Sequence, residues 1–400
     1  MTAALAAVLL GCPPKENSGT TGTSGTGSTA ASSGNEILVG EFGSLTGAQA
    51  TFGTSTHNGI MMAIDEVNAA GGINGKQIVV KTEDDQSKQD EAANAVQKLV
   101  SQNGVIAMLG EVASSASLAA APICQNAKVP MITPSSTNDE VTKKGDYIFR
   151  VCFTDSYQGS SLGSYVAKQL GFKNVALLTD VKSDYSQGLG ASFEKEFTAN
   201  GGKIVARASY TNGDADFKSQ LTTVKAANPQ ALFVPGYYTD IGQMAIQKKD
   251  LGLNVPMIGG DGWESPRLIE IGGPSLEGSM YSNHYFYGDP TPLVHGFVEK
   301  YKQRFKETPD ALAALGYDAA RVLADALKRT GGKGGAELRD SIAATKNFPG
   351  VTGAITIGPT RDAIGKKLVI EEIKGGQLTL KATVEPSGTP APATATTATH

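Results

Sequence analysis

The sequence has few of the residues from which catalytic and metal sites are most often built. Its 400 residues include three cysteines, four histidines and one tryptophan. Lys and Arg (35) nearly balance Asp and Glu (39), which gives a net charge of −4 without a basic stripe, so a nucleic-acid partner is not expected. No apolar run approaches the ~20 residues that a membrane-spanning helix needs. The length exceeds the usual size of one core, so two domains are expected.

The motifs of common enzyme classes are also missing. There is no Gly-x-Ser-x-Gly elbow, His-Glu-x-x-His pair or Cys-x-x-Cys, and no phosphate loop that ends in Gly-Lys-Ser/Thr. The adjacent carboxylates Asp84 and Asp85 are more typical of a helix start than of an acid–base pair. The histidines are scattered and are expected at the surface or in packing: His57, His284, His295 and His400. The sequence therefore predicts no enzyme, no metal and no cofactor.

Both ends of the chain differ in composition from the middle. Residues 1–12 end in Leu-Leu-Gly-Cys, which resembles the lipobox of bacterial lipoproteins and would make Cys12 a lipidated N-terminus, although no Lys or Arg precedes the apolar run. A trimmed start would explain that absence, and a frayed terminus with an incidental cysteine is the alternative. The Gly/Ser/Thr-rich residues 13–35 predict a flexible tether, and residues 386–400 predict a disordered tail.

The other two cysteines, Cys124 and Cys152, allow two interpretations. They can pair in an oxidising compartment, or they can be buried free thiols. Their apolar helix and strand contexts favour free thiols.

The middle of the chain alternates strands and helices. The strands Ile37–Phe42, Gln77–Lys81 and Val105–Leu109 alternate with helices that begin at Thr54 or Ser55 and at Lys88. This order predicts a parallel sheet with helices on both faces, and a second unit of the same kind restarts after residue 153. We therefore expect an α/β fold of two doubly wound lobes joined by several crossovers. The expected lobes are residues 36–153 plus 284–362 and residues 154–283 plus 363–385.

One stretch, Met108–Asn138, predicts a binding site. Two short apolar runs each end in small hydroxyl residues, and Ser114 or Ser115 is expected to cap a helix over Ser117–Lys128. The free N–H groups of such a helix start attract an anion, for example a carboxylate. Ligands of parallel α/β sheets bind beyond the carboxyl ends of the strands, where both loops lie. The alternative is an ordinary helix cap without a ligand.

Several segments resemble one known family in their order and spacing: Gly40–Gly47 with Phe52-Gly53, Asn68–Gly75, Asp84–Ser87, Gly110–Ser117, Pro130–Asn138, Phe149–Gly159, Gly236–Gln243 and Gly316–Ala320. They are similar to the extracytoplasmic solute-binding proteins for leucine, isoleucine and valine, which serve ATP-driven (ABC) importers. The similarity runs from about Ile37 to Val384. It implies the type I periplasmic binding protein fold, in which two lobes close on a ligand.

The resemblance also implies the ligand contacts. The carboxylate of a bound amino acid would meet Ser114, Thr137 and Tyr237. Its ammonium would meet the backbone carbonyl of Ser135, the hydroxyl of Thr137 and the carboxylate of Asp261. Aromatic rings of Phe52 and Tyr185 would flank the ligand side chain, and Trp263 would join them. The leucine-binding members carry Glu at the position of Asp261 and a small apolar residue at that of Ser135, so the identity of the ligand is left open.

The sequence thus predicts a monomeric, lipid-anchored binding protein on the outer face of the cytoplasmic membrane, with an amino acid as ligand and an ABC permease as partner. Two alternatives keep the same frame: a ligand-sensing lipoprotein, and a binder of amide or urea-like solutes. An amide hydrolase would need a nucleophile beside a base, and the sequence suggests none.

Overall fold

The structure, a computed structural model, describes residues 35–386 and 390–391. The predicted lipidation site Cys12 and nearly all of the predicted tether lie outside the described residues. Within the described range, no helix is both long enough and apolar enough to span a membrane.

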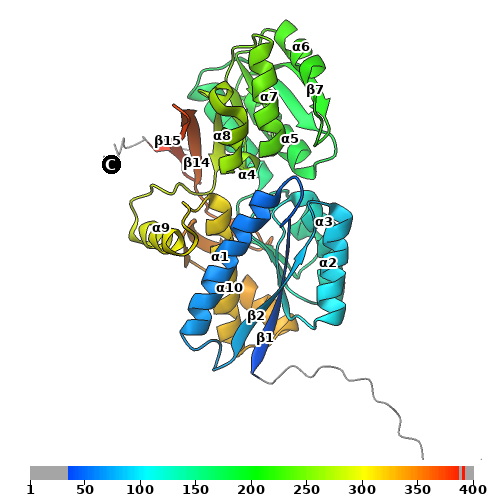
Figure 1. Ribbon diagram of the computed structural model, residues 1–400, viewed down its shortest axis with the longest axis vertical. Helices are drawn as coiled ribbons and strands as arrows, with labels where there is room; N and C mark the ends of the chain where they lie inside the picture. Colours follow the sequence, from blue (N-terminus) through cyan, green and yellow to red (C-terminus); the bar gives the residue numbers. More distant parts are fainter. Residues whose placement is uncertain (1–34, 387–389, 392–400) are drawn as a thin grey trace, which may run out of the picture. The chain divides into compact units, whose positions relative to one another are not determined.

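The first half of the chain forms a five-stranded parallel sheet with the order β2-β1-β3-β4-β5 (Figure 1). The strands are β1 Glu36–Gly43, β2 Gln77–Asp84, β3 Ala107–Leu109, β4 Met131–Thr133 and β5 Ile148–Arg150. The helices between them are α1 Ala50–Ala69, α2 Gln89–Gln102 and α3 Ser114–Ala127. A short 3-10 helix, Thr142–Lys144, precedes β5.

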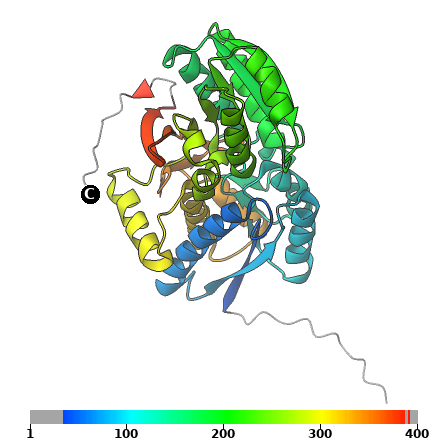
Figure 2. The same cartoon turned by 45° about the horizontal axis from the view of Figure 1, so that its top comes forward.

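Both faces of the inner strands β3 and β4 are buried, which explains why these two strands are short, mainly apolar runs. Ala107 and Leu109 belong to the core beneath α1 and α10 (Ala311–Thr330), whereas Met108 between them faces α2 and α3. Side chains alternate across a strand, so each short strand serves two cores. Although α1 and α10 are far apart in the sequence, they pack side by side in both views (Figure 1, Figure 2).

The second sheet has eight strands in the order β16-β15-β14-β10-β9-β8-β6-β7. Its strands are β6 Asn174–Asp180, β7 Lys203–Tyr210, β8 Ala231–Phe233, β9 Met257–Gly259, β10 Met280–Asn283, β14 Leu368–Lys374, β15 Gln377–Val384 and β16 Pro390–Ala391. Strands β6 to β10 run parallel, and β14 to β16 extend the sheet antiparallel. Its helices are α4 Asp155–Lys168, α5 Asp184–Ala199, α6 Lys218–Ala226, α7 Tyr238–Asp250 and α8 Pro266–Gly272. The α/β fold with two parallel-sheet units is therefore confirmed.

The chain passes between the two sheets three times, through residues 151–154, 284–291 and 365–367. After the second passage come α9 Pro292–Phe305, α10, α11 Gly335–Ala343 and a small sheet of β11 Phe348–Gly350, β12 Gly353–Ile357 and β13 Ala363–Ile364. Because β13 pairs with β12, the third passage lies a few residues later than the expected boundary at residue 363.

Several local expectations need correction. Helix α3 begins at Ser114, so neither Ser114 nor Ser115 caps it. The N-cap residue is Ala113, whose methyl side chain cannot accept a hydrogen bond from the first turn. Helix α1 begins at Ala50, before the expected Thr54 or Ser55, whereas α2 begins at Gln89, one residue after the expected Lys88. Early starts of this kind arise because a sequence pattern shows the apolar face of a helix but not where its first turn closes.

The expected tail also contains a two-residue strand. Pro390 and Ala391 form β16, which pairs with Thr383 and Val384 of β15. An edge strand offers unpaired backbone groups to any segment that can extend beside it, and proline is tolerated in such an outermost strand.

Cys124 and Cys152 are buried free thiols, as the favoured interpretation expected. Burial raises the pKa of each to about 12, so both remain protonated at neutral pH.

Candidate functional site

Seven of the eight predicted ligand residues line one small cavity, in which the centre of a water-sized sphere can move through about 10 Å³. The complete lining is Phe52, Val112, Ser114, Ser135, Thr137, Tyr185, Tyr237, Asp261, Gly262 and Leu312. Every polar member is at most 8% exposed. Among the described residues that line the cavity, none is Lys or Arg.

The walls of this cavity come from the two sheets. Ser114 starts α3 after β3, and Ser135 and Thr137 follow β4, so these three belong to the first sheet. Tyr237 follows β8 and Asp261 follows β9 in the second sheet. All five follow the carboxyl ends of parallel strands, which is where α/β sheets bind ligands.

The first wall is suited to a negative group. Ser114 opens α3, and the backbone N–H groups of a first helical turn have no partner within the helix. The Ser114 hydroxyl accepts a hydrogen bond from the Asn138 backbone N–H at 3.2 Å, so its own proton is available to another acceptor. The hydroxyl of Ser135 is buried and has no partner among the described residues. This wall therefore presents neutral donors and a helix start to the cavity.

The buried acid Glu111 lies behind this wall but does not cancel the attraction of the wall for an anion. Glu111 accepts hydrogen bonds from the backbone N–H of Ala113 and from the Ser44 hydroxyl at 3.1 Å. Burial, aided by the charge of Asp85, raises the pKa of Glu111 to about 8. At neutral pH the carboxyl group is therefore mostly protonated, and the start of α3 keeps its attraction for an anion.

The second wall carries the one acid of the cavity. Asp261 is 6% exposed, and its Oδ1 accepts a hydrogen bond from Gln158 Nε2 at 2.8 Å. Its Oδ2 lies 3.0 Å from His284 Nε2. Burial lowers the pKa of His284, which leaves the ring neutral and the charge of Asp261 uncompensated. A carboxylate in this state is suited to a cationic group of a ligand.

Aromatic rings close the space between the two polar ends. Tyr185 and Tyr237 stack with ring centroids 5.3 Å apart, and Phe52 meets Tyr237 edge-on at 5.7 Å. The Tyr185 hydroxyl accepts a hydrogen bond from the Gly262 backbone N–H at 3.0 Å, so its ring is held in place. With Val112 and Leu312, these rings form an apolar wall.

Trp263 is the predicted residue that the structure does not bring to the cavity. It is fully buried, and its indole Nε1 donates to the backbone oxygen of Val234 at 3.0 Å. Its ring lies so close to Gly259 that a Cβ there would sit 2.1 Å from it. A ligand contact by Trp263 has no support in this arrangement.

The two walls also contact each other directly around the cavity. The Ser115 hydroxyl donates to Asp184 Oδ2 at 2.7 Å, and Asn138 Nδ2 donates to the Asp184 backbone oxygen at 2.7 Å. The Tyr238 hydroxyl donates to the backbone oxygen of Ala48 at 3.1 Å. These bonds join α3, the loop after β4 and the loop before α1 to α5 and α7, so the two walls are in contact around the cavity in this conformation.

Known proteins share this architecture. A family model described as periplasmic binding protein matches residues 36–377. A Leu/Ile/Val-binding protein homolog of Brucella abortus is 30% identical, over 86% of this chain and 91% of that one. A leucine-binding protein of Thermotoga maritima is 38% identical, with a TM-score of 0.84 over 88% of this chain and 99% of that one. A branched-chain amino acid transporter substrate-binding protein of Streptococcus pneumoniae, solved with isoleucine, is 34% identical, with a TM-score of 0.83 over 88% and 100%.

The chain belongs to the periplasmic binding protein family. The family resemblance drawn from the sequence is thereby confirmed, and so is the type I fold that it implied.

Several residues of this periplasmic binding protein surround the predicted set without having been predicted. Val112, Gly262 and Leu312 line the cavity, and their apolar character gave no signal in the sequence. Behind the lining, Asp155 is fully buried and neither carboxylate oxygen has a partner among the described residues. Burial and the charge of Asp261 raise the pKa of Asp155 well above its usual range. Only its place at the start of α4, beyond β5, hinted at a position near the ligand.

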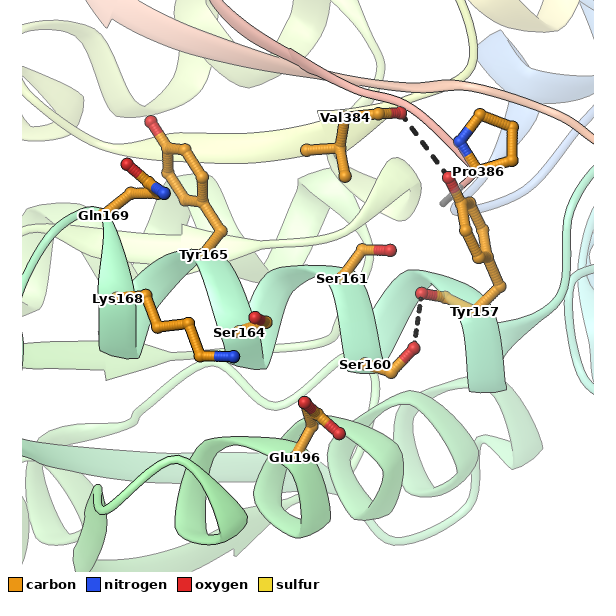
Figure 3. Close-up of a pocket in the computed structure, with 10 residues that line it drawn as sticks. All are labelled: Tyr157, Ser160, Ser161, Ser164, Tyr165, Lys168, Gln169, Glu196, Val384 and Pro386. Carbon is orange, nitrogen blue, oxygen red and sulfur yellow. Dashed lines mark hydrogen bonds between the residues drawn. The ribbon is translucent and has the colours of Figure 1, made fainter. Parts of the chain in front are cut away.

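A second, more open hollow of the periplasmic binding protein lies elsewhere. Measured in the same way, it has about 420 Å³ and runs along α4, between α5 and the end of β15 (Figure 3). Figure 3 shows Tyr157, whose hydroxyl donates to the backbone oxygen of Val384 at 3.5 Å, with Glu196 on the opposite side. None of the predicted ligand residues lines this hollow. The smaller cavity, where charged and neutral polar groups converge, is the better candidate for the ligand site.

Proposed function

We propose that this periplasmic binding protein captures an amino acid with an apolar, branched side chain outside the cytoplasm and presents it to an ABC importer. One observation carries the proposal: a single enclosed cavity combines a helix start with hydroxyls, one uncompensated carboxylate and an apolar wall. A zwitterion that leaves water must have both of its charges met, and these are the groups that meet them.

The roles of the residues follow from their chemistry. The start of α3, with Ser114, Thr137 and Tyr237, would bind the carboxylate of the ligand. Asp261 would bind the ammonium, together with the Thr137 hydroxyl and the backbone carbonyl of Ser135. Phe52, Val112, Tyr185 and Leu312 would enclose the side chain. Micromolar affinity corresponds to about −8 kcal/mol, which one paired zwitterion and one buried apolar side chain can supply.

Binding would follow from movement of one sheet unit against the other. Ligand would dock on the wall that bears Ser114 and Thr137, and the wall that bears Tyr237 and Asp261 would close over it. We assign the hinge to the three passages between the sheets, residues 151–154, 284–291 and 365–367. The closed form would be the one that the permease recognises. The protein would act as a monomer without catalysis, held at the membrane by a lipid on Cys12.

A ligand panel tests the proposal. The apparent unfolding temperature is measured with each of the common amino acids, with amides and urea-like solutes, and with aromatic acids that lack an ammonium group. Leucine, isoleucine and valine should raise it most, since a ligand at 100 times its dissociation constant stabilises the folded state by about 2.7 kcal/mol. Calorimetry then gives the affinities. If only solutes without an ammonium group stabilised the protein, the assigned role of Asp261 and the proposed ligand class would both be wrong.

A further inference from the structure

His284 lies behind the ligand cavity and contacts the acid on its wall. It follows β10 directly, in the second passage between the sheets, and is fully buried. Its Nε2 lies 3.0 Å from Asp261 Oδ2. Its ring stacks on that of Phe153, with centroids 3.7 Å apart and planes 22° from parallel. Phe153 belongs to the first passage, so one imidazole links Asp261 to two of the three passages.

The hydrogen-bond partners of His284 determine its tautomer. Nδ1 is buried and has no partner among the described residues. A proton on Nδ1 would leave a buried donor unpaired and would turn the Nε2 lone pair toward the carboxylate of Asp261. A proton on Nε2 instead makes a charge-assisted hydrogen bond to Asp261. Burial lowers the pKa of His284 despite the opposing effect of Asp261, so the ring holds the carboxylate without neutralising it.

We propose that His284 is a positioning residue for the ammonium of the ligand: it donates from Nε2 to Asp261 Oδ2 and fixes that carboxylate relative to the passages that carry Phe153 and His284 itself. The inference rests on the proposed function. Asp261 has a single methylene between backbone and carboxylate, so its reach depends on where its two anchors, His284 and Gln158, hold it. An acid that is already oriented loses less entropy on binding, which raises affinity without a new contact.

Two substitutions separate positioning from packing. His284→Gln keeps a side-chain N–H donor, whereas His284→Leu fills the same space without one. Leucine affinity, measured by calorimetry, should fall about tenfold or more in His284→Leu, which is the usual effect of losing a hydrogen bond to a charged group. In His284→Gln it should stay within about threefold of the wild type. The exposed His295→Gln serves as the matched control and should bind as the wild type does.

A ligand analogue without an ammonium group distinguishes a positioning role of His284 from a packing role, because a packing defect would weaken the binding of leucine and of the analogue alike. 4-Methylpentanoate has the side chain and carboxylate of leucine but no ammonium, so its weaker binding should be nearly the same in all three variants. Equal losses for leucine and 4-methylpentanoate in His284→Leu would overturn the inference. So would equal leucine losses in the Gln and Leu variants, or no loss in either. If the wild type itself failed to bind leucine, the proposed function would be wrong, whatever the role of His284.

The wild-type protein allows a test that does not depend on whether the variants fold. With ¹⁵N-labelled histidine, NMR reports which ring nitrogen carries the proton, and the spectrum of His284→Gln identifies the signals of His284. The proton should be on Nε2, with a neutral ring at pH 7. A proton on Nδ1, or a doubly protonated ring, would contradict the arrangement.

Discussion

The two walls of the cavity differ in charge: one carries neutral hydrogen-bonding groups, and the other carries a carboxylate. The wall from the first sheet offers only neutral groups: hydroxyls of Ser114, Ser135 and Thr137, and the start of α3. The wall from the second sheet offers a formal charge, Asp261, held by Gln158 and His284. Several backbone and hydroxyl dipoles can share a carboxylate, whereas an ammonium in a dry site needs a counter-charge. In the proposed function, each wall alone would meet one half of a zwitterion, so selectivity for amino acids should require both walls.

The largest effect should come from the charged wall. Asp261→Ala should weaken leucine binding about 100-fold or more, because the buried ammonium loses its counter-charge. Calorimetry measures the affinity, and circular dichroism shows whether the fold is kept. Asp261→Glu is the matched control and should retain most of the binding. Unchanged affinity in Asp261→Ala would show that the second wall does not supply a counter-charge to the ligand.

The neutrality of the first wall can be tested through Glu111. Its pKa is about 8 in the folded protein and about 4.5 when exposed, so between these values the folded state holds a proton that the unfolded state releases. The free energy of unfolding should therefore fall as pH rises from 5 to 8, by up to about 1.4 kcal/mol per pH unit. Urea denaturation at several pH values measures the slope, which should be shallower in Glu111→Gln. An equal slope in both proteins would show that Glu111 is ionised and that the wall is not neutral.

A smaller loss should follow from removing one hydroxyl of the first wall. Thr137→Val keeps the shape of the side chain and should weaken leucine binding about tenfold, since one hydrogen bond to a charged group is lost while other donors remain. The comparison with Asp261→Ala is the informative quantity. If Thr137→Val cost as much as Asp261→Ala, the two walls would contribute alike.

The smallest effect should be that of Trp263→Phe. Trp263 packs behind the second wall and does not line the cavity, so leucine affinity should change less than about twofold. The loss of the bond to Val234 should lower the free energy of unfolding by about 1 kcal/mol. A large loss of affinity with unchanged stability would place Trp263 in the ligand site after all.

Much of the candidate site could be predicted from the sequence because its residues follow strands. Ser114, Thr137, Tyr237 and Asp261 each come shortly after a short apolar run, and the carboxyl ends of parallel strands share one edge of a sheet. The family resemblance then supplied the pairing of these residues with parts of a zwitterion. Their position next to strands also explains why the prediction for Trp263 differed: its neighbours reach the cavity, but the short 3-10 helix Asp261–Trp263 turns its ring toward Val234 and Gly259.

The sequence alone determined the α/β class, the two units and the strand ends that form the candidate site, because these depend on local periodicity and on the order of elements. Only the tertiary structure decided that Leu312 of α10 joins the wall, that Glu111 lies buried behind α3, and that His284 reaches Asp261. These contacts join segments from 23 residues apart (His284 and Asp261) to 200 residues apart (Leu312 and Val112), and burial shifts the pKa values of Glu111 and His284. Neither the long-range contacts nor the burial of these residues can be read from their neighbours in the sequence. Both arise when the three passages between the sheets bring the two walls together.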